Sequence, residues 1–201
     1  VMNRSSFIRL ASLAALTLVA FTLSRCKKSG GSNSSGSGNS GSYYVKFKLN
    51  GISVEYDSQP IAELSYSGSD GLYSATLVAY SNVNAGTKDA ITIIVYSDNA
   101  IAANTPYNDP AKATETGGEP VPQSTVFWYD STGAGYLSAG EFADAGGNIP
   151  IAGMVANSRL TITELTSTDL KGTFSGTVYN SGDFSESNVI TDGEFYLKRE
   201  Q

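Results

Sequence analysis

Hydrophobic and polar residues alternate with a period of two over much of the chain from Tyr43 onward. In residues 43–49 every second residue is apolar or aromatic, and Lys46 and Lys48 point to the opposite side. Such alternation predicts a strand with one buried face. Asn50-Gly51 follows directly. Because both central residues of a type I′ turn need a positive φ, this pair predicts a tight hairpin into the next alternating segment, 52–56.

The same kind of pattern returns throughout the rest of the chain, and no segment sustains a helical period. Residues 90–96 (AITIIVY) are apolar on both faces, which predicts a central strand. About eight to ten short strands with almost no helix predict an all-β fold, and we expect an antiparallel β-sandwich of jelly-roll or Ig-like type rather than a barrel. The segments with a strand pattern are 43–49, 52–56, 72–80, 90–96, 125–130, 135–138, 159–165, 170–179 and 189–199.

Residues 97–124 interrupt this rhythm. The segment contains Pro106, Pro110, Pro120 and Pro122 and shows no strand pattern. A connection of this length is unusual in a compact domain, where long loops are often functional. A crossover between the two sheets of a sandwich is the simpler interpretation, and it is the one we favour.

Residues 1–25 have the organisation of a bacterial signal peptide. A short positive segment precedes an uncharged apolar run at 10–23, which is too short to cross a membrane comfortably. The segment 23–26 (LSRC) resembles a lipobox, and this resemblance implies that Cys26 becomes the lipidated first residue of the mature protein. Arg25 departs from the pattern, in which a small residue precedes the cysteine. An ordinary secretory signal and an uncleaved N-terminal anchor are the alternatives.

Residues 26–42 form a predicted tether. Lys27 and Lys28 follow the cysteine, and residues 29–42 consist only of Ser, Gly and Asn. Such a composition cannot bury apolar surface and behaves as a flexible coil. Residues 43–201 have the length and the hydrophobic content of one folded domain. We therefore expect a domain on a flexible tether, held to a membrane by the lipid.

Charge and composition exclude several kinds of chemistry. From Tyr43 onward eight basic residues stand against nineteen acidic ones, so the domain has a net charge of -11 and repels the phosphate backbone of nucleic acids. The chain contains no histidine, which removes the most frequent general base and every Ser-His triad. Cys26 is the only cysteine and precedes the domain, which therefore has no disulfide and no thiol nucleophile.

Five short motifs of the domain form a set, namely 50–52 (NGI), 104–107 (NTPY), 160–164 (LTITE), 171–176 (KGTFSG) and 190–195 (ITDGEF). Together they resemble a family of uncharacterised lipoproteins common in Bacteroidetes. The resemblance implies a β-sandwich at the cell envelope and brings no activity with it, so no functional residue is transferred. In lipoproteins that this chain resembles, acidic residues just after the cysteine mark export to the cell surface. This chain has Lys27 and Lys28 at those positions. We therefore expect an outer-membrane-anchored lipoprotein that faces the periplasm.

Four aromatic residues are the candidate ligand-binding residues: Tyr107, Trp128, Tyr129 and Tyr136. Aromatic rings on a β-sandwich can stack against the apolar faces of sugar rings, whose hydroxyl groups seek polar partners. Packing within the sheets is the alternative, because strands favour aromatic residues in any case. Trp128 and Val126 are two residues apart and share one face of the predicted strand, which indicates that Trp128 lies in the core.

Acidic residues offer two further possibilities. A glycosidase needs two carboxylates across a cleft, but nothing in the spacing of Asp130, Glu141, Asp144, Asp192 and Glu194 selects a pair. Residues 192–194 (DGE) predict a β-bulge instead, with the glycine in a left-handed conformation and the acids exposed. Oxygen atoms at 98–99 and 107–109 would supply part of a Ca²⁺ site, without the spacing of an EF-hand loop. No other cofactor is expected.

These observations predict a membrane-anchored envelope lipoprotein with a non-catalytic binding or structural module. Its expected partners are the membrane, through the lipid anchor, and a glycan or an envelope protein, but not nucleic acid. A carbohydrate-binding or carbohydrate-processing β-sandwich is the alternative. A binding module predicts an exposed aromatic or apolar patch near 97–124, whereas an enzyme requires a cleft that holds paired acids.

Overall fold

The computed structural model of the chain describes residues 43–82, 88–108, 112–114, 120–142, 149 and 151–200. The predicted signal peptide, Cys26 and the tether lie outside these residues, as do the possible Ca²⁺ ligand Asp109 and the possible glycosidase acid Asp144. The described part is almost wholly β, which confirms the all-β prediction. Its one helical element is a single 3₁₀ turn, Ala139–Phe142.

Thirteen strands are present in the described residues. Every segment with a strand pattern in the sequence is a strand, with bounds that agree within about two residues. The strands are β1 Tyr44–Leu49, β2 Ile52–Tyr56, β3 Ser58–Ser67, β4 Leu72–Tyr80, β5 Ala90–Ser97, β6 Thr105–Asn108, β7 Lys112–Thr114, β8 Pro120–Pro122, β9 Ser124–Tyr129, β10 Gly135–Ser138, β11 Arg159–Leu165, β12 Asp169–Asn180 and β13 Ser187–Arg199.

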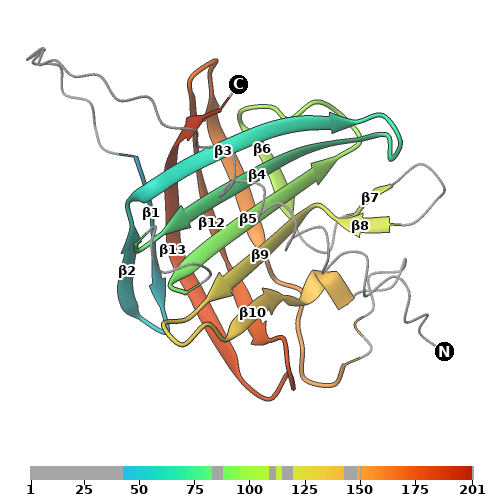
Figure 1. Cartoon of the computed structure of the whole chain (residues 1–201). Helices are drawn as coiled ribbons and strands as arrows, with labels where there is room; N and C mark the ends of the chain where they lie inside the picture. The colour runs from blue at the N-terminus through green and yellow to red at the C-terminus, as the bar shows by residue number, and fades with distance from the viewer. Residues whose placement is uncertain are drawn as a thin grey trace, which may run out of the picture. The chain divides into compact units, whose positions relative to one another are not determined.

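Eleven of these strands belong to one sheet, in the order β2-β1-β13-β3-β4-β5-β9-β10-β12-β11-β6, while β7 and β8 pair with each other. β12 also pairs with β13, so the strand pairings from β13 through β3, β4, β5, β9 and β10 to β12 form a closed ring. Figure 1 shows the resulting arrangement, in which β3, β4, β5, β9 and β10 lie across β1, β13 and β12. We call the first group the front layer, and β2, β1, β13, β12, β11 and β6 the back layer.

Neighbouring strands pair antiparallel, as predicted, with one exception among the described strands. β3 pairs in parallel with the end of β13, through Lys198 opposite Ile61 and Arg199 opposite Ala62. β13 is thirteen residues long, and its pairing with β1 ends at Tyr196. The residues beyond that point reach the front layer, so the parallel pair links the two layers at a corner.

The core lies between the two layers and is filled by alternate residues of the strands. Val45 and Phe47 of β1 are buried, as their alternation predicts. Leu160 and Ile162 of β11 are buried as well. β5 has neighbours on both sides and buried residues on both faces, which confirms the prediction of a central strand. Removal of this apolar surface from water is the main force that holds the layers together.

The segment 97–124 contains three strands, so the prediction of a long connection without strands was wrong. β6 pairs with β11 in the back layer, and β9 then returns to β5 in the front layer. The segment therefore crosses from the back layer to the front layer of one sheet, and a crossover between two separate sheets stays a prediction. Proline interrupts the pattern of these strands, because Pro106 lies on an edge strand and Pro120 and Pro122 are the first and last residues of the three-residue β8.

The hairpin between β1 and β2 has the conformation that its sequence predicts. Asn50 and Gly51 both have a positive φ, at 50° and 84°. Asn50 also ties the hairpin to β13, because its Oδ1 accepts a hydrogen bond from the backbone N–H of Val189 at 2.8 Å. Its Nδ2 donates to Asn188 Oδ1 at the same distance. This turn therefore fixes the register of β1 against β13.

Candidate functional site

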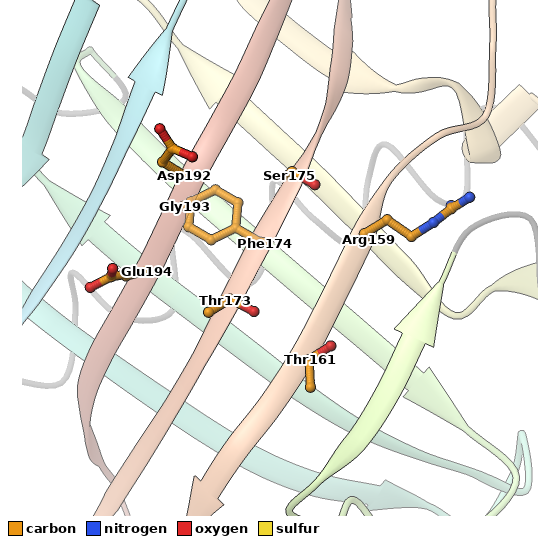
Figure 2. Close-up of a pocket in the computed structure, with 8 residues that line it drawn as sticks. All are labelled: Arg159, Thr161, Thr173, Phe174, Ser175, Asp192, Gly193 and Glu194. Carbon is orange, nitrogen blue, oxygen red and sulfur yellow. The ribbon is translucent and has the colours of Figure 1, made fainter. Parts of the chain in front are cut away.

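The outer face of the back layer carries a shallow groove along β12, with a volume of about 400 Å³. We call it the β12 groove. It is open to solvent and lined by three neighbouring strands, as Figure 2 shows. The lining consists of Asp192, Gly193 and Glu194 from β13, Thr173, Phe174 and Ser175 from β12, and Arg159 and Thr161 from β11.

The groove exists because side chains of neighbouring strands stand in rows. Lys46 of β1 pairs with Glu194, Glu194 with Thr173, and Thr173 with Thr161. Paired residues on one face of a sheet have Cβ atoms about 4.5–5.5 Å apart. The short side chains of β12 therefore leave a hollow between the longer side chains of β13 and β11.

A β-bulge in β13 places two acidic side chains together on this face. The register of β13 against β1 shifts between Thr191 and Glu194, which confirms the predicted bulge and its exposed acids. The predicted glycine conformation was wrong, because the residue with positive φ is Asp192, at 52°. Gly193 is needed for a different reason. A Cβ at this position would overlap the backbone oxygen and the ring of Phe174.

Two lysines of β1 are paired with these acids. Lys46 Nζ lies 2.9 Å from Glu194 Oε2, and Lys48 Nζ lies 2.8 Å from Asp192 Oδ2. The hydrogen bond to its carboxylate raises the pKa of each lysine. The Glu194 and Asp192 side chains remain 50% and 67% exposed. Each acid is therefore an anionic hydrogen-bond acceptor that is still open to a ligand.

The opposite wall of the groove supplies hydrogen-bond donors. Arg159 is exposed there, and its Nη1 donates to the backbone oxygen of Ser158 at 2.9 Å. The hydroxyl groups of Thr161, Thr173 and Ser175 can both donate and accept. The groove thus combines anionic acceptors, hydroxyls and a cationic donor. Such a set suits a ligand that itself carries many hydroxyl groups.

A row of tyrosines on the same face was missed by the sequence analysis. Tyr44 pairs with Tyr196, and Tyr196 pairs with Lys171. The ring centroids of the two tyrosines lie 6.4 Å apart, and Lys171 Nζ lies 4.8 Å from the centroid of Tyr196. Both rings are half-buried. Alternation along β1 and β13 was the signal that places them on the solvent face.

The four aromatic residues predicted to bind a ligand do not form an exposed surface. Tyr107, Trp128 and Tyr136 are only 2%, 8% and 7% exposed, and Tyr129 is half-buried. Tyr107, Trp128 and Tyr136 are buried too deeply to present an open face to a sugar. Trp128 lies in the core, as predicted from the strand face that it shares with Val126. Its ring centroid lies 5.0 Å from that of Tyr136, and its indole N–H donates to the Tyr56 hydroxyl at 3.0 Å.

The described part of 97–124 does not show the exposed patch expected of a binding loop. Tyr107 is buried, and its hydroxyl accepts a hydrogen bond from the backbone N–H of Ala102 at 3.0 Å. Val121 is buried beside Leu72, on the far side of β4 from the main core. These contacts pack the crossover against the layers.

Of the possible glycosidase acids outside the groove, the structure describes the side chain of Asp130 alone. Its Oδ1 accepts hydrogen bonds from the backbone N–H groups of Thr132 and Ala134, at 2.8 and 2.9 Å. Burial raises the pKa of Asp130, but the hydrogen bonds outweigh it and the net shift is downward. Asp130 therefore stabilises a turn. The side chain of Glu141 lies outside the description.

The described residues contain no group of three acidic, histidine or cysteine side chains placed to hold a metal ion. They also contain no helix with the length and apolar character of a membrane span.

In comparisons with protein-family models, with curated proteins and with solved structures, nothing matches this chain. The resemblance to Bacteroidetes lipoproteins stays a prediction.

Proposed function

We propose that residues 43–201 are a non-catalytic binding module and that the β12 groove takes a hydroxyl-rich ligand, a glycan of the cell envelope. One observation carries this proposal: the acceptors Asp192 and Glu194 and the donor Arg159 line the same groove, on opposite sides of the hydroxyl groups of β12. Sugar hydroxyls donate and accept hydrogen bonds, so they can use both walls at once. The adjacent tyrosine row offers ring surface for the apolar faces of the sugar.

The placement of the groove acids supports binding rather than hydrolysis. A glycosidase flanks the scissile bond with one proton-donating acid and one free carboxylate. Asp192 and Glu194 instead lie on the same strand and the same wall, each held by a lysine. Carbohydrate processing is therefore the less favoured alternative.

The membrane attachment in this proposal depends on Cys26. A lipid there would hold the domain at the outer membrane, on the periplasmic side, with the tether leaving its orientation free. Mass spectrometry of the mature N-terminus should find an acylated Cys26, and Cys26→Ser should release the chain from the membrane fraction. Protease added to intact cells should leave the domain uncut. An uncleaved or unlipidated N-terminus would contradict the anchor, and cleavage in intact cells would contradict the periplasmic side.

The groove is tested with the full chain and a panel of oligosaccharides that includes cello-, xylo-, manno- and chito-oligomers. We expect a member of the panel to shift the amide signals of Thr161, Thr173 and Ser175 in ¹H–¹⁵N spectra. Thr173→Arg fills the floor of the groove and should weaken binding by about tenfold or more, as expected when hydrogen bonds to charged groups are lost. Thr163→Arg makes the same change at an exposed residue outside the groove and is the matched control.

Two results would contradict the binding site. One is a panel in which no oligosaccharide perturbs the groove amides. The other is a ligand whose affinity Thr173→Arg and Thr163→Arg leave equally unchanged. Either result would favour a structural role, or a protein partner at another surface.

A further inference from the structure

A second hollow lies at one end of the core, and we call it the end pocket. It has a volume of about 320 Å³ and is lined by residues of β3, β4, β11 and β13 and by the start of the crossover after β5. Leu64, Ile101 and Leu165 make part of its wall apolar. A small concave site with apolar walls and a few polar groups is the usual form of a small-molecule site.

Two tyrosines form an aromatic wall of the end pocket. Tyr66 and Tyr73 are partners across β3 and β4, with ring centroids 4.6 Å apart and ring planes inclined by 40°. Tyr66 is 56% exposed, although Ala62, on the same face of β3, is completely buried. The inner face of the front layer is therefore uncovered at this end, and its aromatic surface is open to a ligand.

Arg199 is the one charged residue among those that line the end pocket. Its Nη1 donates to the backbone oxygen of Thr166 at 2.9 Å, which holds the side chain in place. Its Nε is enclosed and has no hydrogen-bond partner among the described residues. An enclosed donor without an acceptor is unfavourable. Because Nε is enclosed, a ligand can meet the guanidinium only through its other N–H groups.

Charge and polar groups indicate the class of ligand. The domain as a whole is strongly acidic, yet the end pocket is lined by a cation and no carboxylate. An anionic group on a ligand would therefore meet attraction here. Ser65 and Ser74 also line the pocket, but they alternate with Tyr66 and Tyr73 along β3 and β4, so their hydroxyls lie on the other face of the sheet.

We infer that the end pocket binds a sugar ring that carries a carboxylate, as in a uronic acid residue. The tyrosine wall takes the apolar face of the ring, and Arg199 donates to the carboxylate in a charge-assisted hydrogen bond. The end pocket and the β12 groove share no residue, so this inference stands or falls independently of the proposed glycan site.

The Nε–Hε signal of Arg199 in ¹H–¹⁵N spectra of the full chain reports on this site directly, and its loss in Arg199→Gln assigns it. Sodium glucuronate should shift the signal in a saturable way, and glucose, which lacks the carboxylate, should bind about tenfold more weakly. Arg199→Gln should weaken glucuronate binding by about tenfold or more. Lys198→Gln removes the same charge from an exposed neighbour and should leave binding unchanged.

Tyr66→Ala tests the aromatic wall without changing the arginine and should weaken glucuronate binding about fivefold. It also keeps the test decisive if Arg199→Gln fails to fold. A shift of the same size with sodium acetate would overturn the sugar ring. An unmoved Arg199 signal, or glucuronate binding that Tyr66→Ala leaves intact, would overturn the site. Thr173→Arg should bind glucuronate normally, which separates this result from failure of the groove.

Discussion

The inner and outer faces of β12 are made of alternate residues of one strand, yet they have very different tolerance for change. On the inner face a Cβ at Gly172 would overlap the ring of Phe195 and the backbone oxygen of Thr161. On the outer face the neighbouring Thr173 is exposed in an open groove. The inner face therefore specifies the fold, and the outer face is free to carry recognition.

The largest effect should come from adjacent residues of β13 that lie on opposite faces. Phe195 is 2% exposed in the core, so Phe195→Ala should lower the free energy of unfolding by about 3–5 kcal/mol. Tyr196 is half-buried on the outer face, and Tyr196→Ala should lower it by about 1 kcal/mol or less. Urea unfolding of the full chain measures both. Equal losses would abolish the distinction between the faces.

A smaller effect should follow from adding a single methyl group to β12. Gly172→Ala has no space for its Cβ and should lower the free energy of unfolding by about 2–3 kcal/mol. Thr173→Ala, one residue further along on the open face, should change it by no more than about 0.5 kcal/mol. The same urea measurement applies. A neutral Gly172→Ala would show that the inner face has room to adjust.

Asn50 differs from the exposed residues of the outer face, because it is exposed and nevertheless stabilises the fold. Asn50→Ala removes the hydrogen bonds to Asn188 and Val189 and places alanine at a positive φ. We expect a loss of about 1–2 kcal/mol in the free energy of unfolding. Ser53→Ala, at an exposed position of β2, should have almost no effect. Thermal unfolding of the two variants side by side tests whether exposure alone predicts tolerance.

The smallest effect concerns the pH dependence of stability. Hydrogen bonds from the Thr168 and Tyr43 hydroxyls lower the pKa of Asp169 from its ordinary value of 3.8. The ionised carboxylate therefore stabilises the folded state above that pH, and this contribution is lost as the pH falls through the lower folded-state pKa. Asp169→Asn should flatten the fall of the unfolding temperature below pH 4. Identical pH profiles would show that these hydrogen bonds do not affect stability.

Much of the fold could be predicted because a period of two reports directly on burial. The alternation around Val45 and Phe47 identifies a strand and its inner face, and Asn50-Gly51 identifies the turn that follows. β6 could not be recognised, because an edge strand tolerates Pro106 and needs no run of apolar residues. Its pairing with β11 joins residues about fifty positions apart in the sequence, and the local alternation of apolar and polar residues does not predict such a pairing.

The candidate site was harder to predict, because it depends on register between strands. Thr173 and Arg159 become neighbours of Asp192 only when β11, β12 and the bulge of β13 are aligned. Aromatic character alone selected Trp128, whose alternation already indicated the core. Alternation along β13 also places the half-buried Tyr196 on the outer face, because it follows the inward-facing Phe195.

Whether the outer face of β12 is a binding surface independent of the fold is tested most directly by measuring binding and stability in one variant, Thr173→Arg. Urea unfolding and oligosaccharide binding are measured on the same preparation of the full chain, beside Thr163→Arg. We expect Thr173→Arg to keep its unfolding midpoint while its affinity falls by about tenfold or more. If affinity is retained, or is lost together with the stability of the fold, the outer face of β12 is not an independent binding surface.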